Sequence, residues 1–173
     1  GDYFGPLVVA AAYVDGPTAR KLLEIGTADS KSIKGDKRIT DLADEIRKTV
    51  RGRFSIVPIG PEAYNRLHKK FRNVNRLLAW AHARALENLL EKVGTCPRAI
   101  SDQFGNKKTV ENALLAEGRK IRLEQRPRAE ADVAVAAASV LARAEFVRRL
   151  QKLADEFGLD SLPKGAGSHV PEK

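Results

Sequence analysis

The chain has 173 residues, which is enough for one domain of ordinary size to bury a core without disulfide or metal staples. Its lone Cys96 can form no internal disulfide, no apolar run is long enough to span a bilayer, and the first residues lack the order of a signal peptide, so we expect a cytoplasmic protein. With 31 Lys and Arg against 22 Asp and Glu, the formal net charge of +9 favours an anionic partner such as a nucleic acid over a basic surface that serves only solubility.

The first third of the chain alternates strands with helices. An almost unbroken apolar run over residues 7–14 follows a turn rich in glycine and predicts a strand covered on both faces. Helices are expected near 18–25 and 39–50, with a polar loop between them. The alternating segment 53–59 predicts a second strand.

A long amphipathic helix is predicted over residues 74–93, because apolar side chains recur at three- and four-residue steps. Trp80 and His82 fall within it, and aromatic side chains at helical spacing are expected in the core. The other elements expected in this part of the chain are a helix opened by Pro61, a strand over 98–104, a helix over 107–117, a strand over 120–126 and a long helix over 131–157. Together they predict an α/β domain, and the short early connections favour a mixed sheet over a fully parallel one.

Carboxylates at two element boundaries could carry chemistry. Asp102 lies near the end of a predicted strand, where side chains project into the ligand crevice of open α/β sheets. Glu130 or Asp132 begins the last long helix, where the helix dipole favours an anion. Such oxygens suit Mg²⁺ or Mn²⁺, but a two-metal hydrolase needs more than two carboxylates. Taken singly, each acid is also explained by turn formation or helix capping.

Six segments, in order, resemble the motifs of the type 2 ribonucleases H: GDYFGPLVVAAAYV, ADSK, NVNRLLAWAHARALE, SDQF, RAEADVAVAAASVLAR and LPKGAG. The opening and closing motifs are more similar to the ribonuclease HIII branch than to the HII branch, which is the runner-up. The resemblance covers essentially the whole chain, 1–173, as a single catalytic domain. It implies an RNase H fold, with a mixed central sheet flanked by helices. It also implies an endonuclease that cleaves the RNA strand of RNA–DNA hybrids with two Mg²⁺ or Mn²⁺ ions.

The resemblance also implies that half of the metal site is absent from this sequence. In the family, a strand ending in Asp-Glu precedes the glycine turn that contains Gly1. The chain therefore lacks the expected first strand and first two catalytic acids, and this segment alone is expected to be inactive. The alternative is a noncatalytic module that binds RNA–DNA hybrids or duplexes with an incomplete metal site.

Carried over by motif, Asp102 matches the third carboxylate of the family and Glu130 of RAE matches the fourth. Asp132 stays open as the alternative to Glu130, because a boundary between strand and helix can turn either acid inward. The resemblance further implies nucleic-acid contacts from the residues Gly1, Ser30, Lys31, Asn75 and Arg143. A plain turn, a solvated basic loop, a helix cap or a solvated helix arginine would explain the same residues without a ligand.

Overall fold

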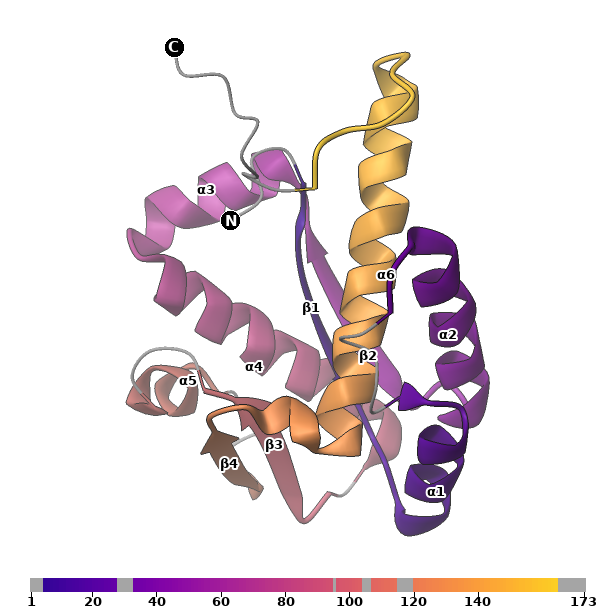
Figure 1. Ribbon diagram of the computed structural model, residues 1–173. Helices are drawn as coiled ribbons and strands as arrows, with labels where there is room; N and C mark the ends of the chain where they lie inside the picture. The colour runs from indigo at the N-terminus through magenta and orange to yellow at the C-terminus, as the bar shows by residue number, and fades with distance from the viewer. Residues whose placement is uncertain (1–4, 28–32, 95, 104–106, 115–119, 165–173) are drawn as a thin grey trace.

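The computed structural model describes residues 5–27, 33–94, 96–103, 107–114 and 120–164, apart from the side chains of residues 107 and 130 (Figure 1). The elements are β1 (Leu7–Ala12), α1 (Gly16–Glu24), α2 (Asp36–Thr49), β2 (Phe54–Ile59), α3 (Pro61–Phe71), α4 (Val74–Val93), β3 (Arg98–Asp102), α5 (Lys107–Ala113), β4 (Arg122–Arg126), the 3₁₀ helix η3 (Ala129–Ala131) and α6 (Val133–Glu156). The expected order of strands and helices is confirmed. The α/β class is confirmed with it.

The four strands form two separate pairs. β1 and β2 are antiparallel, with Val9 opposite Val57, as the short early connections predicted. β3 and β4 are parallel, with Asp102 opposite Arg126. The strand directions are therefore mixed, although no strand within the described ranges joins one pair to the other.

The core lies on both faces of the β1–β2 pair. One cluster packs α1, α2 and α6 against one face and includes Leu22, Ile39, Ile46 and Leu141, all fully buried. A second cluster packs α4 against the other face through Leu77, Ala81 and Ala85, with side chains of α3 around it. Figure 1 shows α6 and α2 on one side of this pair and α3 and α4 on the other.

The first strand is less buried than its apolar sequence predicted. Only Val9 is buried, and the other side chains of β1 are half-buried. β1 pairs with β2 along one edge and lines a cavity as well. Of the helices that the structure describes, none combines the length and the apolar character needed to cross a bilayer.

Gly5, two residues before β1, lies against the aromatic ring of Phe146 on α6. A Cβ at this position would overlap the ring, so the ring must move if Gly5 is replaced. We expect Gly5→Ala to lower the free energy of unfolding by about 1–3 kcal/mol, the usual cost of overpacking. Urea denaturation measures this loss.

A double-mutant cycle with Phe146→Leu provides the control for this prediction. Because the smaller side chain makes room for the methyl group, the double variant should lose less stability than the sum of the two single losses. A Gly5→Ala protein as stable as the wild type would contradict the contact.

Candidate active site

Asp102 is the last residue of β3, and its side chain is exposed. Its Oδ1 accepts one hydrogen bond from the backbone N–H of Gln103, at 3.1 Å, and another from that of Ala129, at 3.3 Å. The second bond spans 27 positions of the chain and joins the end of β3 to η3. The structure therefore brings Asp102 next to the segment that holds Glu130 and Asp132.

Asp132 lies between η3 and α6 and caps the helix. Its Oδ1 accepts a hydrogen bond from the backbone N–H of Ala134, at 2.9 Å. A carboxylate here also interacts favourably with the helix dipole. The capping explanation thus holds for Asp132, whereas for Glu130 the structure describes only the backbone, within η3.

The turn that carries Ala129 to Asp102 depends on an unusual backbone conformation. Arg128, which precedes Ala129, is left-handed, with φ 55°. This region disfavours residues with a Cβ atom. Sequence patterns carry no signal for an arginine in this conformation, so this turn could not be anticipated.

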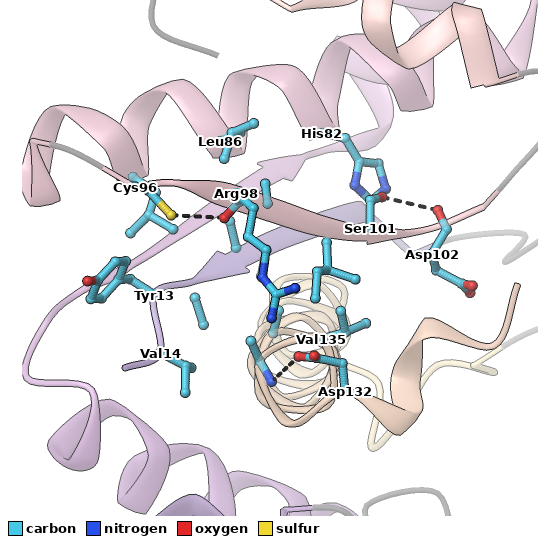
Figure 2. Close-up of a pocket in the computed structure, with 18 of the residues that line it drawn as sticks. Tyr13, Val14, His82, Leu86, Cys96, Arg98, Ser101, Asp102, Asp132 and Val135 are labelled. Carbon is cyan, nitrogen blue, oxygen red and sulfur yellow. Dashed lines mark hydrogen bonds between the residues drawn. The ribbon is translucent and has the colours of Figure 1, made fainter. Parts of the chain in front are cut away.

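Asp102 and Asp132 line one cavity of about 680 Å³ (Figure 2). Every residue of β1 and of β3 lines it, and α4 and the start of α6 contribute further walls. In Figure 2, Tyr13 and Cys96 lie at one end of this cavity, and His82 and Asp102 lie at the other. The cavity is thus a slot between two strands, each of which is paired on one side only among the described residues.

His82 lies on α4 at the Asp102 end of the slot. Burial lowers the pKa of its imidazole to about 4, while the negative charge of Asp102 acts in the opposite direction. The ring is therefore neutral at pH 7. Trp80 packs in the core as expected, with its ring centroid 6.1 Å from that of Phe71.

Arg126 lies opposite Asp102 in the strand register but is engaged elsewhere. Its guanidinium forms an ion pair with Glu124 on the same strand. Arg126, followed by the charges of Arg122 and Arg98, lowers the pKa of the Glu124 carboxyl below its usual value. The Arg126 guanidinium therefore pairs with an acid on its own strand and not with Asp102.

The donor groups at this end of the slot suit a divalent metal in kind but not in number. Carboxylate oxygens such as those of Asp102 and Asp132 are the ligands that Mg²⁺ and Mn²⁺ prefer. Across the described side chains, however, no group of three or more His, Cys, Asp or Glu residues could hold a metal ion. The chemistry of the donors fits such an ion, but the number of described donors falls short of a complete site.

Two of the five residues expected to contact nucleic acid are described by the structure. Asn75 is exposed in the first turn of α4, and the helix cap is not Asn75 but Asn73, whose side chain accepts a hydrogen bond from the backbone N–H of Arg76. Arg143 donates a hydrogen bond to the carbonyl of Ile33, at 3.3 Å, and so ties α6 to the residues just before α2. Gly1, Ser30 and Lys31 lie outside the described residues.

Comparison with known proteins gives one family. The family model for ribonuclease HII matches residues 1–173. Ribonuclease HIII of Chlamydia pneumoniae is 46% identical over 172 residues, covering 98% of this chain and 56% of the relative. Ribonuclease HIII of Protochlamydia amoebophila is 43% identical over 168 residues, covering 97% of this chain and 54% of the relative. The chain thus spans about half the length of these curated relatives.

Solved structures agree with this assignment. Bst-RNase HIII in complex with Mn²⁺ matches with a TM-score of 0.86 and 34% identity, over 98% of this chain and 56% of that one. RNase H3 of Aquifex aeolicus matches with a TM-score of 0.75 and 27% identity, over 98% of this chain and 61% of that one. The chain therefore belongs to the ribonuclease HII family of type 2 ribonucleases H, and its similar curated relatives are ribonucleases HIII.

Proposed function

We propose that the intact protein is an endonuclease that hydrolyses the RNA strand of RNA–DNA hybrids with two divalent metal ions. The observation that carries this proposal is the hydrogen bond between Asp102 and the backbone of Ala129. That bond joins the strand-end carboxylate to the segment of Glu130 and Asp132 in a chain of the ribonuclease HII family. The net charge of +9 is suited to gathering a polyanionic substrate around this acidic point.

Asp102 and Glu130 would hold Mg²⁺ or Mn²⁺ through carboxylate oxygens, with Asp132 as the alternative to Glu130. Manganese is the ion named in the complex of Bst-RNase HIII. When bound, two such ions activate water and stabilise the leaving oxygen of a phosphodiester. The backbone N–H groups of Gln103 and Ala129 hold Oδ1 of Asp102 in place, so that its carboxylate is oriented before any ligand binds.

We further propose that the slot between β1 and β3 receives the strand that is expected before Gly1. A slot bounded by two strand edges can accept a third strand, which would hydrogen-bond to both. If a tight turn joins that strand to β1, the two must be antiparallel. The new strand would then end beside Leu7, at the Asp102 end of the slot, since Tyr13 lies at the opposite end (Figure 2).

This direction supports the expected position of the missing acids. An Asp-Glu pair at the end of the inserted strand would lie near Asp102 and raise the number of carboxylates toward the four that the resemblance implies. The catalytic domain would then be residues 1–173 completed by one further strand. The segment 1–173 without it would hold an incomplete metal site and should not cleave.

Cleavage assays with the intact protein test the proposed activity. We expect fragments from the RNA strand of a labelled RNA–DNA hybrid in Mg²⁺ or Mn²⁺ and none in EDTA, because the reaction needs two bound divalent ions of either kind. The same RNA as a single strand and a matched DNA duplex serve as controls. Tight binding of the hybrid without cleavage in either metal would overturn the nuclease proposal and favour the noncatalytic binding module.

A further inference from the structure

Five exposed cations gather where α3 ends and α4 begins, and we call this group the basic corner: Arg66, Lys69, Lys70, Arg72 and Arg76. The sequence between Glu62 and Glu87 contains no acidic residue. The corner is therefore a region of positive charge formed by one continuous stretch of chain.

No acid among the described residues neutralises these cations. No ion pair between described residues involves any member of the basic corner. Some cations elsewhere are paired, for example Arg53 with Asp15 at 2.9 Å and Arg148 with Glu145 at 2.7 Å. Within the described part of the chain, nothing offsets the positive charge of the corner, so it can attract an anionic partner.

The fold of α3 directs the cations outward. Tyr64, Leu67 and Phe71 turn toward the core formed by α4 and the β1–β2 pair. Lys69 and Lys70 are exposed, and the ammonium of Lys70 lies 5.9 Å from the centroid of the Phe71 ring. Packing of the apolar stripe of the helix therefore fixes where the charges lie.

Arg72 occupies a backbone position that favours a different residue. It is the C-cap of α3 and is left-handed, with φ 52°. Glycine or asparagine takes this conformation at lower cost than arginine. A strained residue at a surface point is a reason to look for a functional role of its side chain.

The corner and the candidate active site are linked by one helix. α4 carries both Arg76, in its first turn, and His82, which lies at the Asp102 end of the slot. Six residues of helix advance about 9 Å, at about 1.5 Å per residue. Duplex nucleic acid carries about one charge per 1.7 Å of its axis, so a duplex above Asp102 would present several phosphates within this distance.

We propose that the basic corner binds the phosphate backbone of the duplex that flanks the cleavage position. The identity of the duplex as an RNA–DNA hybrid rests on the proposed function, whereas the binding surface can be tested without cleavage. Contacts of this kind position the duplex and carry no sequence information.

The test replaces three cations of the corner in the intact protein, Lys69→Gln, Lys70→Gln and Arg76→Gln together. Binding of a 20-base-pair RNA–DNA hybrid is followed by fluorescence anisotropy in EDTA over a series of KCl concentrations. We expect affinity about tenfold or more weaker at 0.1 M salt. The slope of log K against log salt should also be smaller, by roughly 0.9 for each phosphate that the variant no longer neutralises.

The matched control removes the same charge from α1 and α2 by Arg20→Gln, Lys21→Gln and Lys48→Gln. These residues are exposed and belong to helices on the other side of the molecule (Figure 1). The control should change affinity less than about threefold and leave the salt slope unchanged. Equal weakening by both triple variants, or none by the corner variant, would overturn the proposal. So would equally strong, corner-dependent binding to phosphatidylserine vesicles.

A pair of glycine variants separates binding from folding. Arg51, which follows α2, is left-handed like Arg72, with φ 52° at both, but it lies outside the corner. Arg72→Gly and Arg51→Gly should each leave the melting temperature unchanged or raised, because both relieve the same strain. Only Arg72→Gly should weaken hybrid binding, by about threefold. Normal hybrid binding by Arg72→Gly would show that Arg72 is not part of the binding surface.

The two proposals fail in different ways. If the intact protein cuts no hybrid but the corner variant binds duplex more weakly, the nuclease proposal is wrong and the proposed binding surface stands. If the intact protein cuts hybrids and the corner variant binds them normally, only the proposed binding surface is wrong.

Discussion

Asp102→Asn is expected to reduce cleavage of RNA–DNA hybrids by the intact protein by a factor on the order of 10³ or more, the scale on which loss of a main electrostatic contributor acts. The amide oxygen of asparagine can still accept the hydrogen bonds that Gln103 and Ala129 donate to Oδ1. The fold should therefore persist while the negative charge that would hold a cation disappears. Initial rates in Mg²⁺ and in Mn²⁺ measure the loss, and thermal denaturation checks the fold.

Asp44→Asn provides the comparison for this change. Asp44 is exposed on α2 and forms an ion pair with Arg47, at 2.7 Å, remote from the slot. Its replacement removes one negative charge at the surface and should alter the cleavage rate less than about twofold, since exposed ion pairs contribute little. An Asp102→Asn enzyme with activity within about tenfold of the wild type would show that this carboxylate is not a metal ligand.

Glu130→Gln and Asp132→Asn should separate the two candidates for the fourth carboxylate. We expect Glu130→Gln to lower the cleavage rate by about 10²-fold or more, with partial recovery at high Mn²⁺, because a weakened site needs more metal. Asp132→Asn should keep most of the activity. Asparagine caps helices as well as aspartate does, so the bond from Ala134 can persist.

Rates measured over a range of metal concentrations decide between them. The opposite pattern, with the large loss at Asp132 and near-normal rates at Glu130, would transfer the ligand role to Asp132. Asp132→Ala isolates the cap, because alanine cannot accept the bond, and it should lower the free energy of unfolding by about 1 kcal/mol.

The helices could be read from the sequence because their signal is local. The three- and four-residue spacing over 74–93 predicted α4 with the bounds that the structure has. For α6 the prediction began at residue 131, whereas the helix begins at Val133. An N-cap and a first helical residue look alike in a sequence, and only the bond from Ala134 to Asp132 separates them.

The candidate site was less accessible to sequence reasoning. Motifs indicated Asp102 and the segment of Glu130 and Asp132, but nothing local shows that Ala129 returns to the end of β3. That contact depends on the parallel pairing of β3 with β4 and on the left-handed turn at Arg128. Likewise, the bond from Arg143 to Ile33 spans 110 positions, beyond the reach of any periodic pattern.

The division of the described strands into two pairs would couple cation binding to completion of the sheet. In the proposed arrangement, one inserted strand would complete the backbone pairing of both strand edges and deliver the remaining acids. Without that strand, the slot would lack the negative charge needed to hold two cations. Cation binding would therefore depend on the same backbone hydrogen bonds that join the two pairs of strands.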